Sequence, residues 1–122
     1  MMIDALAEHN ESTLVLTIDN REDRREWLRK NHGFNLPWWQ PWHPGAPRPE
    51  KHKAFWFRAV DGQQSPPPRW WYERQPDKPG HGAWGCLQSH AQAAQQAAAD
   101  DVESLLVLED DVTFLPDGEE RL

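Results

Sequence analysis

Ser104-Leu105-Leu106-Val107-Leu108 is an apolar run that leads directly into three carboxylates, Glu109-Asp110-Asp111. Short apolar runs of this kind are typical of strands buried in a parallel sheet. Alternate side chains of an extended chain share a face, so we expect Glu109 and Asp111 on one side and Asp110 on the other. Two carboxylates on one face suit a hard divalent cation, whereas a solvated acidic turn is the alternative explanation of the triplet.

Two further segments are predicted to form strands. Residues 14–18, Leu-Val-Leu-Thr-Ile, are rich in apolar and β-branched side chains, a composition typical of buried strands. Residues 53–60 form a second such segment, which ends at the turn dipeptide Asp61-Gly62. Together with the run that precedes Glu109, these segments predict about three strands.

Two main helices are predicted between these strands. The first covers residues 21–30, follows the capping residues Asp19-Asn20, and ends at Asn31-His32-Gly33. The second covers residues 86–100, because residues 91–99 are alanine and glutamine only, which strongly favours a helix. Strands that alternate with helices imply right-handed crossovers, so the sequence predicts an α/β fold with a parallel sheet.

The remaining segments are expected to lack regular structure. Residues 1–12 are predicted to be a frayed lead-in. Ten of the 11 prolines and six of the eight tryptophans lie within residues 35–80, which predicts long irregular loops at residues 35–52 and 63–80. The tryptophans there are either sugar-stacking platforms or packing residues. We expect one small, incomplete domain over residues 1–122, with exposed apolar sheet edges that lead either to oligomerisation or to partial disorder.

Charge and cysteine content exclude several classes of protein. Of the net charge of −7, most lies at the C-terminal end, where nine acidic residues follow residue 99 with a single base, Arg121. This negative field repels nucleic acid, so no nucleic-acid partner is expected. No apolar run approaches the roughly 18 residues of a transmembrane segment. The single cysteine, Cys86, excludes an internal disulfide framework and indicates a reducing, cytoplasmic compartment.

A glycine-rich segment, Gly82-Ala83-Trp84-Gly85-Cys86-Leu87-Gln88-Ser89-His90, leads into the second predicted helix. Glycines before a helix let backbone amides approach a ligand, and a helix start favours anions. Ser89 and His90 would then lie in the first turn, close to a bound phosphate or sugar. The alternative is that the glycines only form a turn and His90 is a half-buried packing residue. We expect Cys86 to pack as a small hydrophobe rather than to act as a nucleophile.

Polar residues also follow the first predicted strand. Thr17 and Asp19 lie at its end, and Arg24 and Arg25 are expected at the crevice where open α/β sheets bind ligands. Guanidinium groups suit phosphate because they donate two parallel hydrogen bonds. The alternative is that these charges form a solvated helix face.

In order along the chain, these segments resemble glycosyltransferase family 25, which includes lipopolysaccharide-type sugar transferases and collagen galactosyltransferases. The family's Asn-Leu-Asp and following Asp-Arg correspond to Thr17-Ile18-Asp19 and Asp23-Arg24. Its Ala-Val-Asp-Gly corresponds to residues 59–62, and its Gly-Glu-Ile-Gly-Cys with Ser-His corresponds to residues 82–90. Its Val-Leu-Glu-Asp-Asp segment corresponds to residues 107–111.

The chain departs from the family pattern at several places. Thr17 replaces the usual Asn, Ala83 replaces the usual Glu, and the proline- and tryptophan-rich residues 37–49 are not part of the pattern. Family members also continue well beyond the acidic motif. The chain is therefore expected to correspond to the N-terminal portion, with the catalytic base and acceptor contacts in the other half.

The resemblance implies a partial GT-A (Rossmann-like) nucleotide-sugar-binding domain. It implies transfer of a hexose from a UDP-sugar to a glycan or hydroxyl acceptor with inversion, in the cytoplasm or at the membrane periphery where glycan is assembled. A divalent cation, Mn²⁺ or Mg²⁺, would bind Glu109 and Asp111. The donor would contact Thr17, Asp19, Arg24, Asp61, Gly85, Ser89, His90 and Asp110. The alternative is a non-catalytic module that binds a nucleotide-sugar and metal, or a partner protein.

Overall fold

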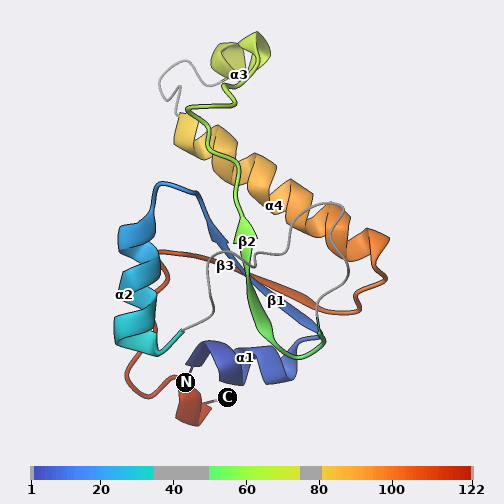
Figure 1. The fold of residues 1–122 in the computed structure, drawn as a ribbon. Helices are drawn as coiled ribbons and strands as arrows, with labels where there is room; N and C mark the ends of the chain where they lie inside the picture. Colours follow the sequence, from blue (N-terminus) through green and yellow to red (C-terminus); the bar gives the residue numbers. More distant parts are fainter. Residues whose placement is uncertain (1, 35–49, 75–80, 122) are drawn as a thin grey trace.

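The computed structural model describes residues 2–34, 50–74 and 81–121. Figure 1 shows the elements in chain order, from the blue N-terminus to the red C-terminus. They are α1 (Met2–His9), β1 (Ser12–Thr17), α2 (Glu22–His32), β2 (Ala54–Arg58), α3 (Arg69–Arg74), α4 (His81–Ala99), β3 (Leu105–Glu109) and the 3-10 helix η1 (Glu119–Arg121). None of the helices in these residues is long and apolar enough to cross a membrane.

The three strands form one parallel sheet in the order β2-β1-β3. In the central strand, Val15 lies between Trp56 of β2 and Leu108 of β3. The predicted α/β fold with a parallel sheet is therefore confirmed. The chain passes from β1 to β2 on one side and then crosses back to β3 on the other side of β1. This reversal of strand order is the feature of open α/β sheets beside which ligands bind.

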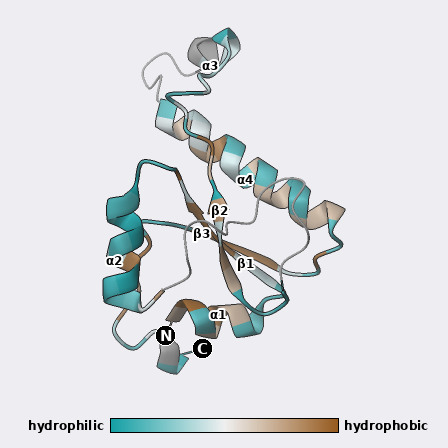
Figure 2. Ribbon diagram, viewed as in Figure 1, coloured by the Kyte–Doolittle hydropathy of each residue, from teal (hydrophilic) through white to brown (hydrophobic). Residues whose placement is uncertain are grey.

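Helices cover both faces of the sheet, as Figures 1 and 2 show. On one face, Val15 and Trp56 pack with Leu28 of α2 and with α1. On the other face, Leu16 and Phe57 pack with Ala93 of α4. Full burial of a large apolar side chain contributes roughly 1.5–3 kcal/mol, so these two layers account for much of the stability.

The N-terminal residues form a helix, so the expectation of a frayed lead-in is wrong. Helix α1 buries Ile3 and Ala7, which are 0% and 1% exposed and belong to the same cluster as Val15 and Leu28. These two residues are four apart and lie on one face of the helix. A helix of eight residues is marginal in isolation, and packing against the sheet stabilises it here.

Helix α4 begins at His81, five residues before the predicted start at Cys86. Gly82 and Gly85 are therefore helical, and Ser89 and His90 lie in the third turn rather than the first. A Cβ atom on Gly85 would lie 2.7 Å from the carbonyl oxygen of Val60. The glycine thus allows a close approach of α4 to the segment after β2, and this packing outweighs the low helix propensity of glycine.

A short helix, α3, lies within residues 63–80, which were expected to be irregular. It follows Pro66-Pro67-Pro68, and proline is tolerated at a helix start because its missing N–H would have no partner there. Trp71 of α3 packs edge-on against Trp84 of α4, with ring centroids 5.2 Å apart. These two tryptophans therefore join helices, whereas Trp38, Trp39 and Trp42 lie outside the described residues.

The boundaries of α2 differ from the prediction at the start and agree at the end. Arg21, not Asp19 or Asn20, is the N-cap residue, and it makes no side-chain capping hydrogen bond. Gly33 ends the helix in the left-handed conformation with φ of 66°, as its sequence position predicts.

Candidate functional site

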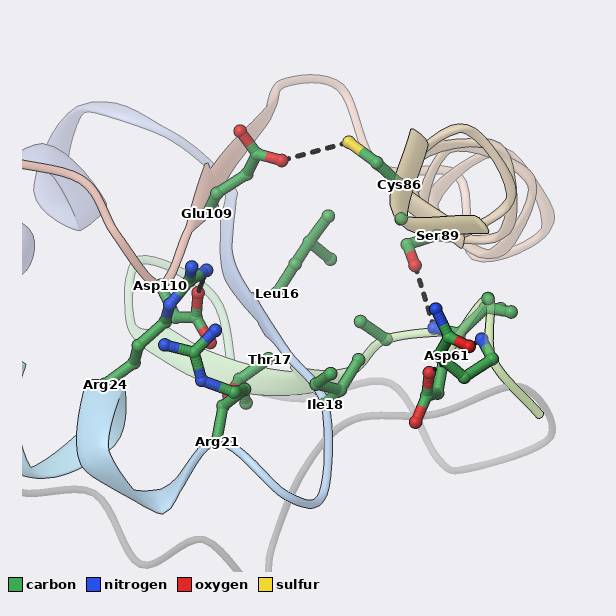
Figure 3. Close-up of a pocket in the computed structure, with 15 residues that line it drawn as sticks. Leu16, Thr17, Ile18, Arg21, Arg24, Asp61, Cys86, Ser89, Glu109 and Asp110 are labelled. Carbon is green, nitrogen blue, oxygen red and sulfur yellow. Dashed lines mark hydrogen bonds and ion pairs between the residues drawn. The ribbon is translucent and has the colours of Figure 1, made fainter. Parts of the chain in front are cut away.

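A cavity of about 310 Å³ lies at the carboxyl ends of the strands, between α2 and α4 (Figure 3). This is the place where the reversal of strand order leaves a crevice in an open α/β sheet. Several predicted site residues line it, namely Thr17, Arg24, Asp61, Ser89, Glu109 and Asp110. The structure thus brings together segments that are widely separated in the sequence.

An ion pair between Arg24 and Asp110 lines the crevice. Arg24 Nη1 lies 2.9 Å from Asp110 Oδ1 and 3.9 Å from Asp111 Oδ2. The side chain of Asp110 is 6% exposed, whereas that of Arg24 is 36% exposed. Asp110 is therefore occupied by the pair, while the guanidinium of Arg24 still has an exposed part that faces the crevice.

Arg25 was expected to lie in the crevice, but it lies buried beneath the loop that follows β1. It donates to Thr17 Oγ1 at 3.1 Å, to the carbonyl of Ile18 at 2.7 Å and to the carbonyl of Asp19 at 2.8 Å. Burial lowers the pKa of Arg25, because removal from water disfavours the charged guanidinium. Its role is to hold this loop in position beside the cavity.

Ser89 holds the segment that follows β2 against α4. Its hydroxyl accepts from the N–H of Val60 at 2.8 Å and donates to the carbonyl of Gly85 at 2.7 Å. The next residue along, Asp61, accepts from the N–H of Gln63 at 2.9 Å, which confirms the predicted turn at Asp61-Gly62. Ser89 is 2% exposed, and the two hydrogen bonds of its hydroxyl, to Val60 and Gly85, are both made within the protein.

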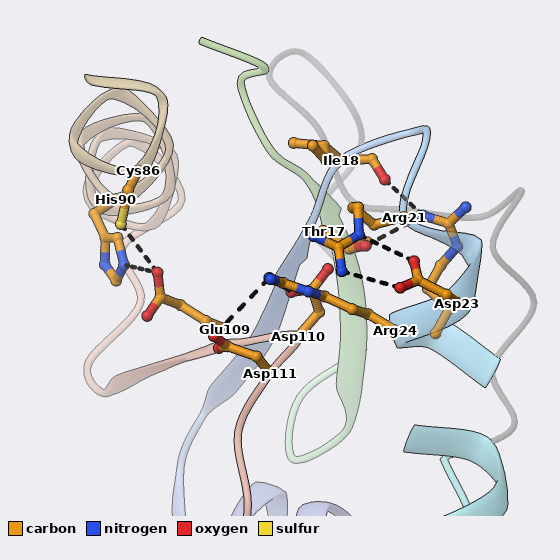
Figure 4. A network of polar contacts seen from close by, with 11 residues as sticks. Thr17, Ile18, Arg21, Asp23, Arg24, Cys86, His90, Glu109, Asp110 and Asp111 are labelled. Atoms are coloured by element: carbon orange, nitrogen blue, oxygen red, sulfur yellow. Dashed lines mark hydrogen bonds and ion pairs between the residues drawn. The ribbon is translucent and has the colours of Figure 1, made fainter. Parts of the chain in front are cut away.

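Glu109 extends toward α4, where it meets Cys86 and His90 (Figure 4). The Cys86 thiol donates to Glu109 Oε1 at 3.0 Å, and His90 Nε2 lies 4.0 Å from the same oxygen. The pKa of Cys86 is raised from 9.0 to about 11, mainly by the hydrogen bond to Glu109 and secondly by burial. Cys86 is exposed, so the expectation that it packs as a small hydrophobe is wrong.

Three predicted site residues lie at the margin of the cavity. Asp111 is 61% exposed and lies beside Arg24, while Asp19 is 70% exposed and pairs with Arg58 at 3.1 Å. Gly85 lies behind the cavity wall, against Val60. Strand β3 ends at Glu109, and the two residues that follow form a turn, so strand alternation does not extend to Asp111. The shared metal site of Glu109 and Asp111 remains a prediction.

Sequence reasoning did not assign a ligand-facing role to Arg21, although this residue lines the cavity. Its guanidinium forms two hydrogen bonds of 3.0 Å with the carboxylate of Asp23, which lower the pKa of Asp23 to about 2. The signal was present in the sequence, because Arg21 lies between the first strand and the helix that carries Arg24.

Comparison with known protein families shows to which family the chain belongs. Residues 10–121 match the family model described as Glycosyltransferase family 25 (LPS biosynthesis protein). The chain belongs to glycosyltransferase family 25. No curated protein and no solved structure is matched by this chain. The family 25 match covers all three strands and the residues that line the crevice.

Proposed function

We propose that this chain binds the nucleotide-sugar donor of a family 25 glycosyltransferase, which transfers a hexose from a UDP-sugar to a glycan or hydroxyl acceptor. The observation that carries this proposal is the crevice at the carboxyl ends of β1 and β3, lined by the Arg24–Asp110 ion pair. Its volume of about 310 Å³ is at the lower end of ligand-binding sites, enough for part of a nucleotide-sugar.

The two arginines of the crevice are the groups that would bind the diphosphate of the donor. The side chains of Arg21 and Arg24 are 35% and 36% exposed, and each is held by a neighbouring carboxylate. Guanidinium groups that are held in place match phosphate oxygens with little loss of side-chain entropy. The segment between Ala59 and Gln63, pinned by Ser89, would close the opposite wall around the donor.

The exposed carboxylates beside this site fit a hard divalent cation such as Mn²⁺ or Mg²⁺. Glu109 and Asp111 have side chains that are 53% and 61% exposed, and Asp110 is occupied by Arg24. Oxygen ligands and room for water and phosphate are what these ions require. When bound, such an ion would neutralise charge on the departing UDP.

Inversion at the sugar carbon requires in-line attack by an acceptor hydroxyl and a base that takes its proton. We assign this base to none of the described residues, since the carboxylates at the crevice have partners or would hold the cation. Donor binding and transfer are therefore tested separately.

Donor binding is tested by thermal unfolding with Mn²⁺ and UDP, singly and together. A ligand that binds only the folded state at about 100 times its Kd adds roughly 2.7 kcal/mol to the free energy of unfolding. Asp111→Asn should lose the Mn²⁺-dependent part of this shift. Glu103→Gln is the matched control, because Glu103 is exposed and precedes the opposite end of β3. A cooperative unfolding transition that neither ligand shifts would overturn the proposal.

Transfer is tested by UDP release from UDP-galactose and UDP-glucose, with sugar acceptors present. Release that depends on both Mn²⁺ and acceptor, with an inverted anomeric configuration in the product by NMR, supports the full reaction. Binding of UDP without release would instead support the alternative of a non-catalytic donor-binding module.

A further inference from the structure

We propose that Cys86, His90 and Glu109 form a binding site for a zinc-type divalent ion at the rim of the crevice. This site differs from the oxygen-only site of Glu109 and Asp111 in its ligands and in the class of ion it selects. It rests on side-chain geometry and does not depend on the proposed function, although the two sites share Glu109.

The three side chains converge on one point from two elements (Figure 4). Cys86 and His90 are four residues apart on α4, which places them on the same face of the helix. Glu109, at the end of β3, faces both of them. Its Oε1 lies 3.0 Å from Cys86 Sγ and 4.0 Å from His90 Nε2, and the three ligand atoms lie within 4.8 Å of one another.

These separations match what a tetrahedral ion requires. With metal–ligand bonds of about 2.0–2.3 Å, two ligand atoms of a tetrahedral site lie roughly 3.3–3.8 Å apart. The observed distances bracket this range, so small side-chain rotations would complete the site. The side chains of His90 and Glu109 are 43% and 53% exposed, which leaves a path for the ion.

The chemistry of the ligands selects the ion. A thiolate and an imidazole favour zinc-type ions such as Zn²⁺ and Co²⁺, whereas Mg²⁺ and Mn²⁺ favour oxygen ligands. Three protein ligands leave a fourth position for water or a ligand oxygen. On binding, the S–H bond of Cys86 breaks, its proton passes to water, and the sulfur electron pair forms the bond to the ion.

Occupancy of this site has a consequence for the proposed donor site. An ion that holds Glu109 together with Cys86 and His90 removes that carboxylate from a cation shared with Asp111. If the proposed function holds, Zn²⁺ should therefore oppose the combined binding of Mn²⁺ and UDP. If Zn²⁺ binds but does not oppose Mn²⁺ and UDP, this result contradicts the Mn²⁺ site and leaves the zinc-type site standing, because the zinc-type site is tested without UDP.

The test is a Co²⁺ titration of the reduced, metal-free chain, followed by absorption spectroscopy. The chain has a single cysteine, so sulfur-to-cobalt charge transfer in the near ultraviolet reports on Cys86. We expect saturation at about one Co²⁺ per chain, with a visible spectrum typical of tetrahedral coordination. Zn²⁺ should displace Co²⁺, and an excess of Mg²⁺ should not.

Variants separate the proposed site from other modes of binding. Cys86→Ser should abolish the charge-transfer band, and His90→Gln and Glu109→Gln should each weaken Co²⁺ binding by about tenfold or more. The matched controls His9→Gln and Glu103→Gln alter exposed residues away from the site and should bind Co²⁺ as the original chain does.

Three results would overturn the inference. The first is a folded chain, by circular dichroism, that shows no charge-transfer band. The second is a band that His90→Gln and Glu109→Gln leave unchanged, which would indicate binding by the thiol alone. The third is half an equivalent of Co²⁺ with a doubled sedimentation mass, which would indicate an ion held between two copies of Cys86. UDP binding measured with Mn²⁺ in the same preparation shows independently whether the proposed function stands.

Discussion

Arg24 Nη1 lies 2.9 Å from Asp110 Oδ1, although the two residues are 86 positions apart in the sequence. The pair joins the first turn of α2 to the turn that follows β3, and both residues line the crevice (Figures 3 and 4). Asp110 is 5% exposed, so its carboxylate depends on Arg24 for the interactions that water would otherwise supply. The pair therefore contributes both to stability and to the shape of the site.

Asp110→Asn should lower the free energy of unfolding by about 1.5–3 kcal/mol, the range for a hydrogen bond that involves charged groups. The substitution keeps the size of the side chain but removes the charge that Arg24 faces. Urea unfolding followed by circular dichroism measures the change. Asp117→Asn is the control, because Asp117 and Arg121 form an exposed pair at 2.7 Å whose loss should cost less than about 1 kcal/mol. Equal losses in the two variants would contradict the structural role of the Arg24–Asp110 pair.

Gly85→Ala should destabilise the chain by about 1–3 kcal/mol. The added Cβ would lie 2.7 Å from the carbonyl oxygen of Val60 and 2.8 Å from the nitrogen of Gly62, so α4 or the segment after β2 must move. Gly82→Ala is the matched control on the same helix, since a Cβ there meets no atom within 4 Å. It should be neutral or stabilise the helix by up to about 1 kcal/mol. Thermal unfolding of the two variants tests this difference in sign.

The Cys86 thiol should react slowly with iodoacetamide at pH 8 in the presence of a chelator. Its hydrogen bond to Glu109 raises its pKa from 9.0 to about 11, so the reactive thiolate is roughly a hundredfold scarcer than in the unfolded chain. The raised pKa contributes stability that is complete below pH 9 and is lost as the pH rises toward 11. Glu109→Gln should accelerate the alkylation by about tenfold, and Glu103→Gln should not. Equal rates in the folded and the unfolded chain would refute this account.

Self-association through the sheet edges is also expected. Within the described residues, β2 and β3 are the outer strands of the sheet, each paired with β1, and outer strands are where the sheets of two copies can meet. Sedimentation velocity should show a mean mass that rises with protein concentration. A single monomer boundary at all concentrations would contradict this expectation.

The strands were predictable because burial on both faces leaves an unbroken apolar run in the sequence, as in Leu14 to Leu16 of the central strand β1. Helix α1 was not, because it is too short for a clear periodic signal and is stabilised by the burial of Ile3 and Ala7. The start of α4 was misplaced for a related reason. Because glycine has a low helix propensity, its presence in the sequence indicates a loop. Only the close contact between Gly85 and Val60 explains why a glycine lies within this helix.

By itself, the sequence determined the parallel α/β architecture and the family, and it placed carboxylates and arginines at strand ends. Local propensity and burial encode these features within short segments. The partners of the site residues were decided only in three dimensions: Arg24 with Asp110, Ser89 with Val60, and Cys86 with Glu109, at sequence separations of 86, 29 and 23. Such pairs form because the crossovers bring the carboxyl ends of the strands together, and a side chain then bonds to whichever group satisfies its charge or hydrogen-bonding capacity.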